Sequence, residues 1–290
     1  MTKMQHNFLF YLTYTQIKIN ILQNILLMLA MKVIWSFCLI FLFLLCQGEA
    51  AAGELYERLT NFPQWEKLTS VRPAMGDLIY PNWMMGSWQV KSTLEDLIAP
   101  LAPDIVTPGF EGNRQYLKQP ISFQVRFVRE TTPHPGLKII PQTRSKSAVV
   151  ADRPFNGLNL ARAYLGDTVL SVKVDPDSPN RQITFLRGER QLVTIVAARA
   201  TETTSDGKFI TTEVFQQLFK GGERPYFNTV ESTTAYRKLA EFNSAIEADQ
   251  VTAVYLSPQD PDYFKAGSRP VALYRYRLEF IPTEEVPTIP

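Results

Sequence analysis

Cysteine is nearly absent from this chain of 290 residues, which contains only Cys38 and Cys46. Both lie near the N-terminus, so the chain beyond residue 52 has no thiol. A disulfide framework, a cysteine-ligated metal and a cysteine nucleophile are therefore excluded there. Histidine is equally scarce: beyond residue 52 the only one is His134, which lies in a turn between two prolines. With so few ligands, neither a zinc site nor a Ser-His-Asp triad is predicted, and we expect no metal and no cofactor.

An excess of one charge is also missing. Lys3, Lys18, Lys32 and Glu49 precede residue 53, so the remaining chain has 27 basic and 27 acidic residues out of totals of 30 and 28. A neutral body gives no electrostatic reason to bind nucleic acid or an acidic membrane. We therefore expect no nucleic-acid partner.

No apolar run is long enough to span a bilayer comfortably. The largely apolar stretch Val33–Cys46 follows Lys32 and is shorter than the roughly 20 residues that a membrane helix needs. Small residues, Ala50–Ala52, come after it. A basic start, an apolar run and a small-residue tail are typical of a cleaved secretory signal. The sequence thus predicts an exported protein without a membrane span in its mature form.

The residues before this signal do not read as domain sequence. Residues 1–30 contain no acidic residue, and we interpret them as a mis-extended start, with Met31 as the true initiator. Residues 31–52 would then be the signal peptide and residues 54–290 the folded domain. The alternative is a genuine extension in which Leu26–Cys46 acts as an uncleaved anchor.

Alternation of apolar and polar residues dominates the rest of the chain. Trp88, Val90, Ser92 and Leu94 alternate with more polar residues, which is the period of a β-strand. The only clear helix is expected over Leu158–Leu165. Further strands or extended pieces are expected at Ile121–Phe127, Lys138–Ile140, Ser145–Val150, Thr168–Val174, Gln182–Leu186, Gln191–Thr203, Phe209–Phe219, Tyr226–Leu239, Val251–Leu256 and Val271–Ile281.

Turn and cap residues complete this pattern. Asn156 is expected to cap the helix and Gly166 to end it, and Leu55–Leu59 could form one helical turn. About nine or ten short strands in a meander, with one short helix, indicate an all-β sandwich or an up-and-down barrel. The proline-rich connection over residues 96–120 either closes one end of the barrel or acts as a lid over a ligand.

The step Gly86-Ser87-Trp88 resembles the Gly-x-Trp signature of lipocalins and related calycin barrels. The resemblance implies a single antiparallel up-and-down barrel. It also implies that an arginine of the last strand, Arg275 or Arg277, packs across Trp88 and closes one end. Gly86 would allow the tight entry turn, because glycine has no Cβ.

The chain as a whole is also similar to an uncharacterised family, a domain of unknown function found in cyanobacteria and plant plastids. The matching segments are Pro81–Trp88, Ala102–Phe110, Arg153–Asn156 and Arg269–Tyr274. The resemblance implies a protein of the thylakoid lumen or the periplasm. It implies no activity and no catalytic residue.

The sequence predicts a ligand cavity better than it predicts a catalytic site. The strand Asn228–Tyr236 has few large apolar residues on either face, so the barrel interior should be partly polar. Barrels of this size can hold one small ligand. The residues expected to line the interior are Arg199, Phe215, Tyr236 and Arg275. The alternative is a filled structural core.

Three functions follow from these observations. The first is an exported calycin-like protein that binds a small apolar or amphipathic ligand. The second is a structural or assembly factor for a photosynthetic or other lumenal complex. The third is an enzyme that uses tyrosine and carboxylates such as Glu202 and Glu213, whose separation in the fold cannot be read from their spacing.

Overall fold

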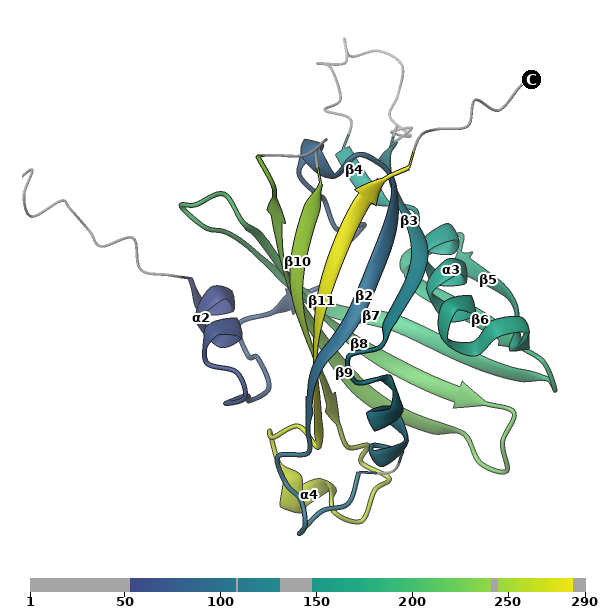
Figure 1. Ribbon diagram of the computed structural model, residues 1–290. Coiled ribbons are helices and arrows are strands. Elements are labelled where there is room, and N and C mark those ends of the chain that lie inside the picture. The colour runs from purple at the N-terminus through teal and green to yellow at the C-terminus, as the bar shows by residue number, and fades with distance from the viewer. Residues whose placement is uncertain (1–52, 108, 131–147, 241–244, 284–290) are drawn as a thin grey trace, which may run out of the picture. The chain divides into compact units, whose positions relative to one another are not determined.

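The computed structural model describes residues 53–107, 109–130, 148–240 and 245–283 (Figure 1). The expected signal region, His134 and the expected extended piece Lys138–Ile140 lie outside these residues. The strands are β1 (Arg72–Pro73), β2 (Gly86–Ile98), β3 (Pro120–Glu130), β4 (Ala148–Ala151), β5 (Val169–Asp175), β6 (Ser178–Leu186), β7 (Arg190–Thr203), β8 (Phe209–Lys220), β9 (Tyr226–Lys238), β10 (Ile246–Tyr255) and β11 (Ala272–Pro282). The helices are α2 (Glu54–Thr60), α3 (Arg153–Leu165) and α4 (Tyr263–Ala266), with 3-10 turns η1 (Asn82–Met84), η2 (Glu111–Tyr116) and η3 (Gly166–Thr168).

All these strands belong to one antiparallel sheet in the order β4-β3-β2-β11-β10-β9-β8-β7-β6-β5, with β1 paired to β7 at the side. From β5 to β11 consecutive strands are neighbours, and the last strand lies against β2. This up-and-down order confirms the predicted all-β fold. The sheet curls into a half-barrel, and α3 packs on β3, β5 and β6 across the gap between its two edges (Figure 1).

Strand β2 illustrates why the predicted strands form. Trp88, Val90, Ser92 and Leu94 are all buried, and the residues between them are more exposed. Successive side chains of a strand point to opposite faces, so this row packs on one face of the sheet. The predicted strand is confirmed, and it continues to Ile98.

Apolar side chains pack on both faces of the sheet. The concave face carries a cluster around Trp88, Phe127 and Phe280. On the convex face, α2 and the chain that follows it cover strands β8 to β11 (Figure 1). The buried apolar residues of this second layer are Leu55, Leu59, Trp65, Leu68, Ile210, Val251, Ala253, Tyr255 and Leu273.

The proline-rich connection after β2 packs at one end of the sheet. Leu101 and Ile105 are buried against Ala266 of α4 and Val271. Further along, the ring of Phe110 lies 6.0 Å from that of Tyr274, which belongs to β11. These contacts favour a segment that closes the end of the sheet over one that gates a ligand.

Helix α3 begins earlier than predicted. Asp152, not Asn156, is its N-cap, and the Asp152 carboxylate accepts a hydrogen bond from the Phe155 amide at 3.1 Å. Pro154 fits the first turn because the amides there have no partner within the helix. The prediction for Asn156 is wrong because this side chain bonds to a strand instead, as described below. The single turn expected at Leu55–Leu59 is part of α2.

Candidate functional site

A cavity of about 580 Å³ lies between the concave face of the sheet and α3. Strands β2 to β4 and β6 to β11 form one wall and α3 forms the other. Pockets of roughly 300 to 1,000 Å³ typically hold small organic ligands. The aromatic residues that line the cavity are Tyr80, Phe123, Phe127, Tyr164, Phe215, Tyr236, Tyr276 and Phe280.

The cavity continues toward one end of the sheet. A neighbouring space of about 320 Å³ shares Tyr164, Gln217 and Tyr276 with it and reaches Asn113 and Tyr116 of η2. The interior of the half-barrel is therefore partly hollow rather than filled throughout.

No charged side chain is among the described residues that line the main cavity. Its polar groups are hydroxyls and amides, and some of them already bond to one another. Gln250 accepts a hydrogen bond from Thr234 at 3.2 Å and donates one to Thr252 at 3.3 Å. Such neutral hydroxyls and amides can form hydrogen bonds with an uncharged molecule. The mixed polar and apolar interior predicted from the sequence is what the structure contains.

The tyrosines of the cavity do not supply an acid–base group near neutral pH. Burial raises the pKa of Tyr80 and of Tyr236 above the ordinary value of 10.0. Burial, followed by the neighbouring Tyr164, also raises the pKa of Tyr276. Each phenol therefore stays protonated and can act as a hydrogen-bond donor.

The N-terminal end of α3 is tied to the edge of the sheet. The Asn156 side-chain oxygen accepts from the Arg126 amide at 2.7 Å, and its nitrogen donates to the Arg126 carbonyl at 3.1 Å. The Asn156 side chain therefore satisfies the Arg126 amide at the open edge of β3, and it shares the Arg126 carbonyl with the Asp152 amide, which donates to it at 3.1 Å. The Arg126 guanidinium also pairs with Asp152 at 2.6 Å and lies 4.2 Å from the centre of the Phe155 ring. These contacts hold α3 over the cavity.

Gly157 of α3 lies against the side-chain amide of Gln182 on β6. A Cβ at this position would lie 2.7 Å from the side-chain nitrogen of Gln182, which is too close for two heavy atoms that are not bonded. Ala161, four residues later, lines the cavity from the same helix. Small residues on this face keep the space beneath the helix open.

A charged cluster lies beside Tyr80, at the edge of the cavity. Arg153 pairs with Asp77 at 2.9 Å and with Glu213 at 3.2 Å, and Arg199 also pairs with Glu213 at 3.2 Å. Burial lowers the pKa of Arg199, whereas for Arg153 the nearby Glu213 and Asp77 outweigh burial and raise the pKa. The cluster joins the segment before η1, the start of α3 and strands β7 and β8.

The structure separates the four residues predicted to line the interior. Phe215 and Tyr236 do line the cavity. Arg199 lies in the charged cluster instead. Arg275 pairs with Asp249 at 2.6 Å and lies over the Phe62 ring, on the side of the sheet that α2 covers.

The suggested carboxylate pair does not come together. Glu213 bonds to the arginines of the charged cluster, whereas Glu202 accepts a hydrogen bond from the Leu55 amide at the start of α2. These partners lie on opposite faces of the sheet, so the two carboxylates cannot act as an acid and base on one substrate.

The residues predicted to close the barrel have other partners. The Trp88 indole donates to the Met84 carbonyl at 2.9 Å, and its ring meets that of Phe280 edge-on at 6.4 Å. In the β2–β11 register Trp88 pairs with Pro282 and Arg277 with Thr93, so the structure does not bring the arginine to the tryptophan. The contacts of Arg277 are ion pairs with Glu247 and Glu279. Gly86 has a φ of +126°, which a residue with a side chain rarely adopts.

The sequence did not predict that α3 forms one side of the cavity. Gly157 and Ala161 are spaced four residues apart, so they share one helix face, and this spacing was the available signal. Gln217 and Tyr276 lie on predicted strands, and Gln250 lies one residue before the predicted strand Val251–Leu256, but their shared cavity depends on pairings that no local pattern specifies.

The described residues contain no group of three or more Asp, Glu, His or Cys side chains arranged to hold a metal ion. Within the same residues, no helix has both the length and the apolarity to cross a membrane. A family model described as "Domain of unknown function (DUF6816)" matches residues 73–284. Neither a curated protein nor a solved structure matches the chain.

Proposed function

Because the chain belongs to the family of the domain of unknown function DUF6816, whose description assigns no activity, we propose its function from the geometry of the cavity. We propose that the protein binds and carries a small apolar or amphipathic molecule between the concave face of the sheet and α3. The observation that carries this proposal is a cavity of about 580 Å³ inside the half-barrel, with no charged side chain among its described lining residues and a largely apolar wall.

The lining of the cavity supports a neutral or weakly polar ligand. Aromatic rings and aliphatic side chains stabilise an apolar body, at roughly 25 cal/mol for each Å² removed from water. Hydroxyls and amides such as those of Thr252, Gln217 and Tyr276 can bond to one or two polar atoms. An ionised ligand would lose its hydration without gaining a counter-ion, so a strongly charged molecule is a poor fit.

The ligand would enter beside α3. Leu160 and Leu165 both line the cavity, and they are 43% and 49% exposed. These two leucines therefore mark the place where the cavity meets solvent. A short helix spanning the gap between two sheet edges can move without breaking the pairing of any strand, which favours α3 as the element that admits the ligand.

We also propose that the mature protein is exported, to a lumen or periplasm. The support is the basic start, apolar run and small-residue tail over residues 31–52. N-terminal sequencing of the protein from its own host tests this proposal. A mature start near Ala50–Gly53 is expected, and a start at Met1 or Met31 would contradict it.

Native mass spectrometry of the protein purified from its own host tests the ligand proposal. The wild type should carry a bound mass of a small organic molecule. Ala161→Phe places a ring inside the cavity and should remove that mass, whereas Ala163→Phe makes the same change on α3 at a residue that does not line the cavity. A bare mass for the wild type, or a bound mass that survives Ala161→Phe, would contradict the proposal.

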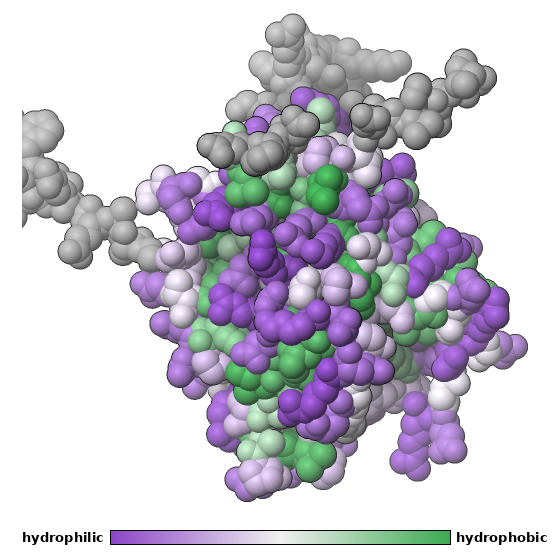
Figure 2. Space-filling model, in the orientation of Figure 1, coloured by the Kyte–Doolittle hydropathy of each residue, from purple (hydrophilic) through white to green (hydrophobic). Residues whose placement is uncertain are grey.

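A second candidate function is an assembly factor, and one surface feature favours it. Val106, in the connection after β2, and Phe264, in α4, are 80% and 90% exposed, and Lys265 joins the two segments by donating a hydrogen bond to the Asp104 carbonyl at 3.2 Å. Figure 2 shows hydrophobic side chains at the lower tip, over α4, below a more hydrophilic middle face. A double change of Val106→Ser and Phe264→Ser should abolish co-purification of a partner if this tip docks one. Unchanged co-purification would exclude the tip as the docking site of the partner.

A further inference from the structure

A second cavity, of about 440 Å³, lies on the convex face of the sheet. On β8, Phe215 lines the interior cavity, Gln216 and Leu218 line this one, and Gln217 borders both. Neighbouring side chains of a strand point to opposite faces. The sheet therefore separates the two cavities, and this second one is independent of the carrier function proposed above.

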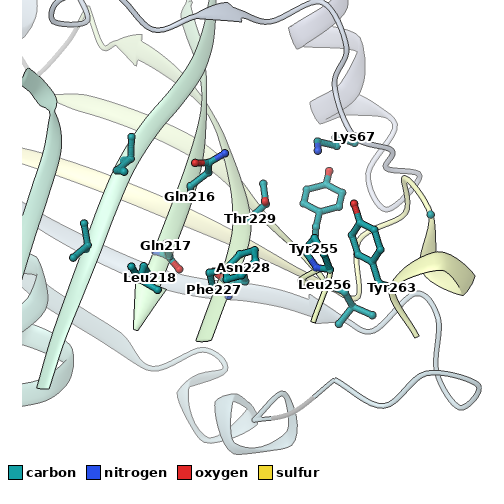
Figure 3. A pocket seen from close by; sticks show the side chains of 14 residues that line it. Lys67, Gln216, Gln217, Leu218, Phe227, Asn228, Thr229, Tyr255, Leu256 and Tyr263 are labelled. Carbon is teal, nitrogen blue, oxygen red and sulfur yellow. The ribbon is translucent and has the colours of Figure 1, made fainter. Parts of the chain in front are cut away.

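The second cavity has a polar side and an apolar side. Figure 3 shows the Lys67 amine and the hydroxyl ends of Tyr255 and Tyr263 on one side, with Leu218 and Phe227 on the other. Burial, followed by the charge of Glu231, raises the pKa of Tyr255, so its phenol is protonated. The Lys67 ammonium and the Tyr263 hydroxyl thus face the cavity from one side, where the Tyr255 hydroxyl already donates to Glu231 at 3.3 Å, and the other side is apolar.

Lys67 carries the only charge among the described residues that line this cavity. Its backbone is fixed, because the Lys67 amide donates to the Ser268 carbonyl at 3.0 Å. Its ammonium, in contrast, forms no hydrogen bond or ion pair with any residue that the structure describes. The buried acid Glu231, which accepts a hydrogen bond from the adjacent Leu68 amide, is already paired with Arg58 at 2.7 Å. The positive charge at the mouth of the cavity is therefore available to a ligand.

We propose that this cavity is a binding site for a small organic anion. The acidic group of the ligand lies against the Lys67 ammonium, and an aromatic or aliphatic body lies against Leu218, Phe227 and Val193. A cation would be repelled by Lys67. A neutral ligand would gain the apolar contacts only, so a negative charge distinguishes the preferred ligand. The cavity is the size of a small molecule rather than of a folded partner.

Titration of the full-length protein with 2-naphthoate and with 2-naphthamide tests this site, because the two probes differ in charge and share a ring system. Amide chemical shifts in NMR spectra locate each probe. The naphthoate should shift Gln216, Leu218 and Tyr255 and should bind more tightly than the amide. Lys67→Met should weaken naphthoate binding about fivefold, as for the loss of one exposed ion pair, and should leave naphthamide binding unchanged.

Two control variants make the result decisive. Lys238→Met removes an exposed lysine elsewhere on the sheet and should leave naphthoate affinity as it is. Ala161→Phe fills the interior cavity and should also leave it unchanged, which separates this site from the proposed carrier site. Equal affinity for the acid and the amide, or shifts confined to residues of the interior cavity, would overturn the proposal.

Discussion

The guanidinium of Arg58 and the carboxylate of Glu231 join the N-terminal segment to the convex face of the sheet, with Nη1 and Oε1 2.7 Å apart. The Glu231 side chain is fully buried. Its second oxygen accepts hydrogen bonds from the Leu68 amide at 3.2 Å and the Tyr255 hydroxyl at 3.3 Å. A buried charge is tolerated only when it is paired and hydrogen-bonded. This cluster therefore fixes the segment after α2, which includes Lys67, on the sheet.

Glu231→Gln should destabilise the fold strongly, because it leaves the largely buried Arg58 charge without its partner. Removing one member of a buried pair typically costs about 3–5 kcal/mol. Urea denaturation monitored by tryptophan fluorescence measures the loss. Glu247→Gln is the matched control, since the partners of Glu247 are surface arginines and the expected loss is about 1 kcal/mol or less. Equal losses for the two variants would show that the Arg58–Glu231 pair has no special role.

Asn156→Ala should destabilise the attachment of α3 to the sheet. The change removes two hydrogen bonds to the Arg126 backbone on β3, each worth about 1 kcal/mol, and leaves the Arg126 amide without a partner, whereas the Arg126 carbonyl keeps its bond from the Asp152 amide. Hydrogen exchange at Arg126 and along α3 measures the effect directly. Asn159→Ala, which loses one bond to the Phe155 carbonyl within the helix, should have a smaller effect. Similar exchange rates in both variants would contradict this role for Asn156.

Stability should fall at alkaline pH because of the buried tyrosines. The pKa values of Tyr80, Tyr236 and Tyr276 lie above the ordinary 10.0 in the folded protein. Above that pH the unfolded chain loses phenolic protons that the folded chain keeps, so the free energy of unfolding decreases as the pH rises. Below it the contribution of these groups is constant.

Urea midpoints at about pH 8 and about pH 11, together with tyrosine absorbance, test this dependence. Tyr236→Phe removes one of these phenols and should show a smaller decrease between the two pH values. If the tyrosine absorbance of the folded protein rose in a single step at the ordinary pKa, the three phenols would not be buried as described.

The strands could be predicted from the sequence because each depends on local alternation. Trp88, Val90, Ser92 and Leu94 show the period of two without knowledge of their neighbours. Asn156 shows that local sequence patterns do not predict which partner a side chain takes in the folded protein. Its sequence context fits a helix cap, but the open edge of β3 competes for the same side chain, and that edge exists only in the folded sheet.

The candidate site was only partly predictable for the same reason. Of the residues expected to line the interior, Phe215 and Tyr236 lie on the concave face and line the cavity. Arg275 was not placed correctly, because the β10–β11 register sets it opposite Val251, on the convex face, where Asp249 is within reach. The pairing of Glu213 with two arginines likewise depends on long-range register.

The most direct test of the account is a fluorescence titration of the wild type, Ala161→Phe and Ala163→Phe with the neutral probe N-phenyl-1-naphthylamine. Wild type and Ala163→Phe should bind the probe in the interior cavity with equal affinity. Ala161→Phe should bind it at least about tenfold more weakly, because a ring occupies the space that the ligand needs. Equal binding by all three proteins, or no binding by the wild type, would contradict a ligand site inside the half-barrel.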